Sequence, residues 1–416
     1  MNQHNNPKIR FKGYDNSLEK KTIGDITTSF SGGTPKSSNK TYYEGNIPFI
    51  RSGEIKLKQT ELFISDEALK NSSAKMVEKG DILYALYGAT SGEVAISQIN
   101  GAINQAILAI KPNSGYSSEF IMNYLKKEKD NILEKYLQGG QGNLSAAIVK
   151  SIELHLPSQE EQSAIGSLFL TLDELLASYN DNLANYQSLK ATMLSKMFPK
   201  AGQTAPEIRL DGFEGEWDCL KMAEIFKIID GDRGKSYPGE NDFQSVGHTL
   251  FLDTGNVKKT GLDFSTTKFI SEKKDKELRN GKLILGDFIL TSRGTLGNVA
   301  LYDKNIQKKY SSVRINSAML ILRPLLGDKI SSDYILAVLR GNLISDFMRV
   351  NQVGSAQPHI TKKEFSKVKV LVPSNIREQQ AIGAYFSNLD NLITSHQEKI
   401  SQLETLKKKL LHDMFI

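Results

Sequence analysis

Residues 161–198 read EQSAIGSLFLTLDELLASYNDNLANYQSLKATMLSKMF, and residues 378–415 read EQQAIGAYFSNLDNLITSHQEKISQLETLKKKLLHDMF. The two stretches align without a gap at an offset of 217. Each carries a row of positions spaced by seven, namely Ile165, Leu172, Tyr179, Tyr186 and Met193 in the first and Ile382, Leu389, His396, Leu403 and Leu410 in the second. A mainly apolar seven-residue repeat sustained this long predicts a long helix that packs lengthwise on another. At 1.5 Å per residue, each helix would be about 57 Å long.

Two interpretations of this repeat stand side by side. An amphipathic helix lying on its own globular domain explains the periodicity, but neither the length nor the duplication. Two such helices in one chain most simply pack on each other. If they run antiparallel, we expect the globular parts at opposite ends, related by an approximate two-fold axis.

The rest of the chain repeats as well, and internal repeats indicate that one structural unit occurs more than once. PKIRFKGYDNSLEKKTIGDI (7–26) aligns with PEIRLDGFEGEWDCLKMAEI (206–225), and INQAILAIKP (103–112) with INSAMLILRP (315–324). Similarly, GDILYALYGATSGEVAI (80–96) corresponds to GDFILTSRGTLGNVAL (286–301), and IELHLPS (152–158) corresponds to VKVLVPS (368–374). The chain is therefore two copies of one module of about 200 residues.

Each module is predicted to be an α+β domain followed by a long helix. Short apolar runs bounded by Gly, Pro, Asn and Ser are typical of strands and turns, whereas residues 117–137 and 331–350 have a helical pattern. Pro157-Ser158 and Pro373-Ser374 precede the long helices, and the serines suit an N-cap. We expect globular domains at 1–157 and 206–373, long helices at 158–200 and 374–416, and a linker at 201–205. The predicted fold class is thus α+β, with two tandem α/β domains and two long helices packed as an antiparallel coiled coil.

The composition limits which partners, membrane segments, disulfides and metal sites the chain can have. The 416 residues carry 53 Lys and Arg against 47 Asp and Glu, a net charge of +6, which is compatible with an anionic partner. No apolar run approaches the roughly 20 residues of a membrane span, and MNQHNNPKIR lacks the apolar core of a signal peptide. A single cysteine, Cys219, excludes an internal disulfide and favours a reducing cytoplasm. Six scattered histidines offer no metal-ligand spacing, so no metal site is expected.

Catalytic motifs are missing from the sequence. Gly234-Lys235-Ser236 resembles the end of a phosphate-binding loop, but Ile229 stands where the first glycine is required. There is no GxSxG elbow, HExxH pair or paired CxxC, nor an Asn- or Asp-Pro-Pro-aromatic tetrapeptide for methyl transfer to a base. We therefore expect no catalytic residues and no cofactor on this chain, and interpret it as a binder.

Polar loops between the strand-like segments supply candidate DNA contacts, because cations bind phosphates and Arg, Lys, Asn and Gln read base edges. The candidates in the first module are Thr34, Lys36, Ser37, Lys40, Arg51, Tyr87, Gln141 and Asn143. Those in the second are Arg233, Lys235, Ser236, Tyr237, Arg293, Arg314, Gln357 and His359. Each single cation could equally be a solvated surface charge, and the glycine-rich loops at 139–145 and 354–361 could be turns that bond to themselves.

SGGTP (31–35), GGQGNLS, GSAQPHIT and the two segments beginning LPSQEEQSAIG and VPSNIREQQAIG resemble the specificity subunit of type I restriction-modification systems. The resemblance covers nearly the whole chain in order. It implies two target recognition domains that each read half of a bipartite, asymmetric site in double-stranded DNA, with the helices setting the spacer. It also implies two modification (methylase) subunits and, when present, restriction subunits as partners, which would carry S-adenosylmethionine, ATP and magnesium. The second module has DGDRGKS in place of SGGTP, so different half-sites are expected.

Two other function classes fit part of the sequence. A two-headed coiled-coil scaffold that binds proteins would explain the helices and the mild charge, but not the paired basic, hydroxyl-rich loops. A self-sufficient nuclease or methylase would need motifs that the sequence lacks.

Overall fold

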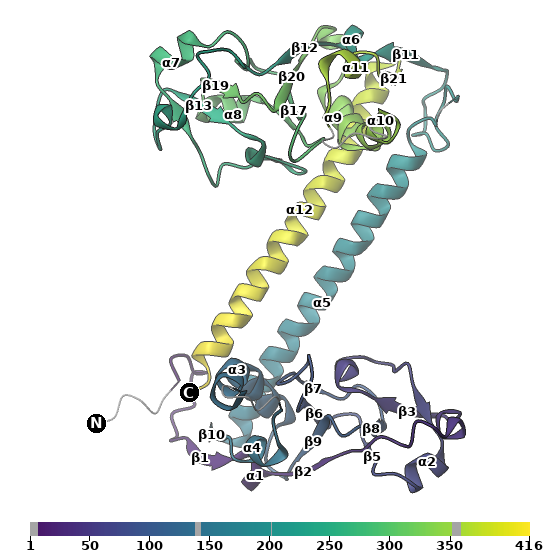
Figure 1. The fold of residues 1–416 in the computed structure, drawn as a ribbon, viewed down its shortest axis with the longest axis vertical. Helices are drawn as coiled ribbons and strands as arrows, with labels where there is room; N and C mark the ends of the chain where they lie inside the picture. Colours follow the sequence, from purple (N-terminus) through teal and green to yellow (C-terminus); the bar gives the residue numbers. More distant parts are fainter. Residues whose placement is uncertain (1–6, 138–142, 201, 352–358) are drawn as a thin grey trace. The chain divides into compact units, whose positions relative to one another are not determined.

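The structure is a computed structural model that describes residues 7–137, 143–200, 202–351 and 359–416 (Figure 1). The chain divides into two compact units, Met1–Asn180 with Lys399–Ile416, and Asp181–Glu398. Each unit therefore contains one globular module and a segment of each long helix. The segments come from both halves of the chain.

Unit 1 is built on two small sheets. The first is antiparallel, with β2 (Thr27–Ser31), β9 (Ile107–Pro112), β6 (Ile82–Ala85) and β7 (Val94–Ile96) in that order. The second has the order β4 (Phe63–Ile64), β3 (Ile47–Ile50), β8 (Gly101–Ile103) and β5 (Lys75–Val77), with β3 and β8 parallel. Its short helices are α1 (Ile23–Ile26), α2 (Asp66–Lys70), α4 (Ala146–Lys150), η1 (Lys40–Tyr43) and η2 (Ser52–Glu54).

Strand β6 is apolar throughout because both faces of its sheet are covered. Ile82 and Tyr84 belong to one hydrophobic core with the helices, while Leu83 and Ala85 belong to a second core with Ile50. Successive side chains of a strand point to opposite faces, so an unbroken apolar run serves both cores. The sequence ILYA accordingly lacks the apolar–polar alternation of a strand that has one exposed face.

Unit 2 repeats the topology. Its first sheet has the order β12 (Phe226–Asp230), β20 (Met319–Pro324), β17 (Phe288–Thr291), β18 (Val299–Leu301). Its second has β16 (Phe269–Ile270), β13 (Thr249–Leu252), β19 (Val313–Ile315), with β13 and β19 parallel, and a hairpin adds β14 (Val257–Lys258) and β15 (Gly261–Leu262). Its short helices are α6 (Met222–Ile225), α7 (Glu272–Glu277), α8 (Lys304–Lys309), α11 (Lys362–Phe365), η3 (Glu240–Asp242), η4 (Thr254–Asn256) and η5 (Gly327–Lys329).

A two-stranded antiparallel ribbon closes each module just before its long helix. In Figure 1, β1 (Glu19–Thr22) lies beside β10 (Glu153–Leu156) although they are far apart in the sequence. The counterpart in unit 2 joins β11 (Trp217–Lys221) to β21 (Lys369–Pro373). The predicted helical stretches are α3 (Ser118–Leu137) in unit 1 and, interrupted at Gly341-Asn342, α9 (Ser332–Arg340) and α10 (Leu343–Asn351) in unit 2.

The long helices are α5 (Gln159–Lys196) and α12 (Ile376–Asp413), each of 38 residues. Ser158 caps α5 as expected, its Oγ accepting the Glu161 N–H at 3.3 Å. The expected cap at Ser374 is wrong. The Asn375 side chain accepts the Arg377 N–H at 2.9 Å, while Ser374 donates to Asp218, because an Asn that follows the serine can itself cap the first turn.

Within each unit the two helix segments pack side by side and antiparallel. In unit 1, the stripe residues Ile165 and Leu172 share a core with Leu403, and Tyr179 and Leu410 pack against it. In unit 2, Ile382 and Leu389 are core residues against which Tyr186 and Met193 pack, and the Tyr186 ring meets His396 edge-on at 5.2 Å. Ion pairs Asp173–Lys407 and Lys190–Asp390 cross between the helices, and the residue numbers of the two pairs add to the same value, as an antiparallel register requires.

The leucines three positions after the heptad residues are not buried between the two helices. Leu175 and Leu406 in unit 1 are 42% and 44% exposed, and Leu189 and Leu392 in unit 2 are 38% and 40% exposed. Two antiparallel helices bury only a narrow seam, so this row of each helix remains at the surface. The exposed leucines occupy equivalent positions in the two repeats.

The first turn of each long helix is fixed to its module by the same buried ion pair. Arg10 donates from Nε and Nη2 to the two carboxylate oxygens of Glu161, both at 2.7 Å. Arg209 binds Glu378 in the same way at 2.7 and 2.8 Å. Glu161 and Glu378 are each 1% exposed, so these bidentate pairs lie in a desolvated place where a two-point contact also fixes orientation.

One turn further on, a glycine lets each helix lie close to its module. A Cβ on Gly166 would come within 2.8 Å of Glu119 Cβ on α3, and a Cβ on Gly383 within 2.6 Å of Asp333 Cβ and Tyr334 N on α9. Any larger residue must push these helices apart. The repeated EQxAIG string thus combines an anchoring carboxylate with a close helix contact.

Candidate nucleic-acid interface

Backbone hydrogen bonds gather three polar loops at one edge of the module in unit 1. The Leu86 N–H donates to the Ala106 carbonyl, and the Leu144 N–H donates to the Leu86 carbonyl, both at 2.8 Å. The Gly33 N–H donates to the Ile103 carbonyl at 3.2 Å, which adds the loop that starts at Thr34. The residues that follow β2 and β6 and those just before α4 therefore meet beside the turn between β8 and β9.

The side chains at this meeting point are linked by Gln105. The Thr34 hydroxyl donates to Gln105 Oε1, and the Tyr87 hydroxyl is also hydrogen-bonded to the Gln105 side chain. Burial raises the pKa of Tyr87, although the bond with Gln105 opposes the rise. Tyr87 also forms an isolated β-bridge with Asn143. We call Thr34, Tyr87, Gln105 and Asn143 loop cluster 1.

Unit 2 has the same construction with different side chains. The Ser292 N–H donates to the Ala318 carbonyl at 2.8 Å, and the Ile360 N–H donates to the Ser292 carbonyl at 3.0 Å. These bonds are the counterparts of those at Leu86, and they place Arg293 and His359 where Tyr87 and Asn143 stand in unit 1. Arg233 Nη2 donates to the Ser317 carbonyl at 3.2 Å. Loop cluster 2 consists of Arg233, Arg293, Ser317 and His359.

The two clusters differ in charge. Cluster 1 contains hydroxyl and amide groups, whereas cluster 2 has two guanidinium groups and an imidazole. Arg293 is exposed, and its side chain makes no hydrogen bond or ion pair with any residue that the structure describes. Arg233 keeps a 3.6 Å ion pair with Asp230 while its side chain stays 49% exposed. A guanidinium held at the surface in this way can still bind an incoming acceptor.

The lysines predicted from the same loops lie at the surface. Lys36, Lys40 and Lys235 are exposed, and none makes an ion pair within the described ranges. Ser37 is also exposed, whereas Ser236 and Tyr237 are half-buried, and the Tyr237 ring packs edge-on against Phe251. Gln141 and Gln357 lie outside the described residues.

Two of the predicted arginines are held by carboxylates instead. The Arg51 guanidinium binds Glu54 and Glu61, whose hydrogen bonds raise its pKa. Arg314 is 6% exposed, and its Nε donates to Asp275 Oδ1 at 2.5 Å. Its other nitrogens donate to the carbonyls of Asn280, Asp275 and Leu278. Arg314 therefore holds the segment 275–280 in place through these hydrogen bonds.

Gln105 and Ser317 were missed by the sequence reasoning. They stand at equivalent positions in the aligned segments INQA and INSA, directly after Asn104 and Asn316, whose Oδ1 atoms accept the backbone N–H two residues on. An Asn side chain that accepts the backbone N–H two residues on forms a turn; within these turns Gln105 is exposed and Ser317 is half-buried. That local signal was available from the repeat.

Among the described residues, no group of three or more His, Cys, Asp or Glu is placed to hold a metal ion, and no helix there is long and apolar enough to cross a membrane.

A duplicated chain whose modules each present a polar loop cluster and each continue into a long helix defines a class of two-headed recognition protein. The family model for the type I restriction modification DNA specificity domain matches residues 16–185 and 214–405, one match for each module. The chain therefore belongs to this family.

Similar proteins match large parts of the chain. It is 21% identical over 403 residues to the type I restriction enzyme MjaVIII specificity subunit of Methanocaldococcus jannaschii, covering 94% of this chain and 90% of the relative. The MjaIX specificity subunit of the same organism is 30% identical over 266 residues, covering 61% and 60%. The crystal structure of a type I restriction-modification S subunit from M. genitalium has the same fold, with a TM-score of 0.66, 17% identity and 99% coverage of both chains.

The family membership decides between the function classes weighed above. The chain is a DNA specificity subunit of a type I restriction-modification system, and it is a non-catalytic component that assembles with other subunits of that system. The mixed α/β fold with two modules and paired long helices, predicted from the repeat, is confirmed. The scaffold interpretation is not favoured.

Proposed function

We propose that each module reads one half of a bipartite, asymmetric DNA site through its loop cluster. The observation that carries this proposal is that equivalent backbone hydrogen bonds present two clusters of different chemistry. Readers built alike but lined with different side chains suit two unlike half-sites. Two linked readers also gain affinity, because binding by one raises the effective concentration of the other at its half-site.

The side chains suggest what each cluster reads. The amides of Gln105 and Asn143 match the donor and acceptor pair on the major-groove edge of adenine, whereas an arginine matches the two acceptors of guanine. We therefore assign an adenine contact to cluster 1 and a guanine contact to Arg293 in cluster 2. Lys36, Lys40 and Lys235 are assigned to phosphates, because exposed cations on the same loops can hold the backbone without reading sequence.

Arg51 and Arg314 take a different part in this proposal. Both have their guanidinium groups satisfied by carboxylates, so we assign them to shaping the loops rather than to contacting DNA. Domain boundaries at residues 157 and 206, with the linker at 201–205, stay predictions within the same scheme. The candidates Gln141 and Gln357 also stay predictions.

The long helices are proposed to set the spacer and to dock two methylase subunits. The exposed pairs Leu175 with Leu406 and Leu189 with Leu392 support this, since surface leucines repeated on both helices are suited to packing against a partner. Restriction subunits would join when present. S-adenosylmethionine, ATP and magnesium are assigned to these partners, and the complex to the cytoplasm.

The first test is to co-express the chain with its methylase subunit in a methylation-free host and to map modified adenines across the genome. The proposal expects one split motif with a fixed spacer. Arg293→Ala should relax the sequence requirement in one half only, at a cost of about 1–3 kcal/mol at that base pair. Lys235→Ala, its control on the same module, should weaken binding to all sequences alike and lessen the salt dependence. Relaxation of both halves by Arg293→Ala would contradict modular reading.

A further inference from the structure

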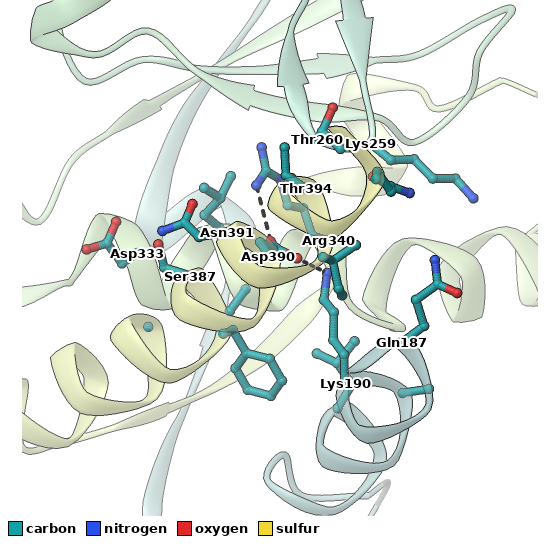
Figure 2. A pocket seen from close by; sticks show the side chains of 18 residues that line it. Gln187, Lys190, Lys259, Thr260, Asp333, Arg340, Ser387, Asp390, Asn391 and Thr394 are labelled. Carbon is teal, nitrogen blue, oxygen red and sulfur yellow. Dashed lines mark hydrogen bonds and ion pairs between the residues drawn. The ribbon is translucent and has the colours of Figure 1, made fainter. Parts of the chain in front are cut away.

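A cavity of about 380 Å³ lies in unit 2, where α5 and α12 meet α9 (Figure 2). Its charged lining consists of Lys190, Lys259, Arg340, Asp333 and Asp390. Three cations thus face two carboxylates, which leaves one positive charge in excess. Amide and hydroxyl side chains complete the polar part of the wall, namely Gln187, Thr260, Ser387, Asn391, Thr394 and Gln397.

The centre of the cavity is one carboxylate shared by two cations. Asp390 Oδ1 binds Lys190 Nζ at 2.5 Å, and Asp390 Oδ2 lies 3.5 Å from Arg340 Nη1, as the dashed lines in Figure 2 show. The side chains of Lys190 and Arg340 are only 22% and 14% exposed. Burial lowers the pKa of Arg340, so its charge is poorly solvated where it stands. The Arg340 Nε and Nη2 atoms donate to the Val299 carbonyl at 3.3 Å, but its one carboxylate partner among the described residues, Asp390, is shared with Lys190. The positive charge is therefore not fully compensated and can attract a further anion.

Unit 1 carries the same three charges at equivalent positions. Lys407, Asp173 and Lys126 align with Lys190, Asp390 and Arg340 in the two repeats. Lys407 forms an ion pair with Asp173, and Lys126 feels the charges of both. Burial lowers the pKa of Lys126, and none of the described residues gives its ammonium group a direct hydrogen bond or ion pair.

We call Lys190, Asp390 and Arg340 in unit 2, and Lys407, Asp173 and Lys126 in unit 1, the cation clusters. They differ from the loop clusters in how closely the two modules agree. The loop clusters diverge between the modules, as two unlike half-sites require. The cation clusters keep the same charges at all three positions, although one lysine is replaced by arginine. A feature that both halves share fits a ligand that both halves bind. Under the proposed function, the protein partner present twice is the methylase subunit.

We propose that each cation cluster is a docking site for an acidic side chain, Asp or Glu, of a methylase subunit, with the cavity in unit 2 receiving one of the two copies. This inference rests on the proposed function. The cavity is a contact additional to the leucine pairs, since Leu189 and Leu392 do not line it. A DNA phosphate fits less well, because a stiff duplex reaches exposed cations, whereas a single carboxylate on a flexible side chain can enter a recess.

The test titrates purified methylase subunit into this chain and measures the dissociation constant at several salt concentrations. Lys259→Glu is the primary variant, because Lys259 lines the cavity, is exposed and makes no ion pair within the described ranges, so that folding is preserved. Arg340→Gln removes the central excess charge. We expect either variant to weaken one of the two methylase sites by about tenfold or more, with a smaller salt dependence. Lys126→Gln should weaken the other.

Lys273→Glu is the matched control, an equal charge change at another exposed lysine of unit 2 that does not line the cavity. Native mass spectrometry at nanomolar concentration should show one methylase subunit per Lys259→Glu chain and two per control chain. Unchanged affinity and salt dependence in both cavity variants would overturn the proposal. So would lost DNA affinity with intact assembly, which would identify a phosphate site. If even the wild-type chain fails to bind methylase or to direct methylation, the proposed function itself has failed.

Discussion

Removing Arg209 should leave the buried carboxylate of Glu378 without its partner and destabilise the first turn of α12. The Glu378 side chain is 1% exposed and receives two hydrogen bonds from Arg209, whose own side chain is 18% exposed. Arg209 also donates to the carbonyls of Gly215 and Glu214 at 2.6 and 2.9 Å. Breaking a buried ion pair by removing one partner costs about 3–5 kcal/mol. We expect Arg209→Ala to lie near 3 kcal/mol, because water can reach the carboxylate through the space that the partly exposed arginine leaves.

The single tryptophan of the chain makes this measurable. Trp217 is 4% exposed and lies in unit 2, two residues after the Gly215 carbonyl that Arg209 binds. Its fluorescence should follow the denaturant-induced unfolding of unit 2, and the midpoint should fall in Arg209→Ala at an unchanged slope. Replacing both partners, as in Arg209→Met with Glu378→Met, should recover most of the loss, since a buried ion pair and an apolar pair of similar volume are often equally stable.

Two controls sharpen the result. Arg10→Ala removes the equivalent pair in unit 1 and should move the Trp217 transition less than Arg209→Ala does. Lys20→Ala removes an exposed ion pair with Glu153, whose side chains are 55% and 60% exposed, and should leave stability unchanged within error. A cost of less than about 1 kcal/mol for Arg209→Ala, or a double replacement as damaging as the single one, would contradict this prediction.

Three further predictions concern the helices and the acid stability of unit 2. Gly383→Ala should destabilise unit 2 by about 1–3 kcal/mol, since the new Cβ overpacks against α9, with Gly341→Ala as a less crowded comparison by the same unfolding assay. Inserting one heptad into both helices, after Asn180 and after Glu398, lengthens each by about 10 Å. The tolerated spacer should then grow by about three base pairs with both half-sites unchanged, as read from methylation maps; an unchanged spacer would exclude the helices as its determinant. Burial tends to raise the pKa of Asp275, but hydrogen bonds from Lys282 and Arg314 outweigh it and hold the pKa below its ordinary value of 3.8. This stabilisation is present above that value and is lost as pH falls through the folded-state pKa, so unit 2 should weaken below about pH 4, and Asp275→Asn should flatten that dependence.

The sequence by itself determined the organisation of the protein. Two aligned heptad stretches predicted α5 and α12, and the ordered repeats before them predicted two modules of one fold. These features are local and periodic, so they can be recognised without knowing which distant residues meet. The loops at residues 34, 87 and 143 could also be chosen, because each combines polar side chains with glycine between strand-like segments.

Only the tertiary structure decided how individual side chains are used. Arg51, Arg293 and Arg314 look alike in the sequence, yet carboxylates hold the first and third while the second is left at the surface. Gln105 joined loop cluster 1 because β9 lies between β2 and β6, which brings the loops beside them together. The cation clusters likewise combine three helices from distant parts of the chain. Charge pairing and burial depend on contacts between residues far apart in sequence, and a periodic pattern carries no information about those contacts.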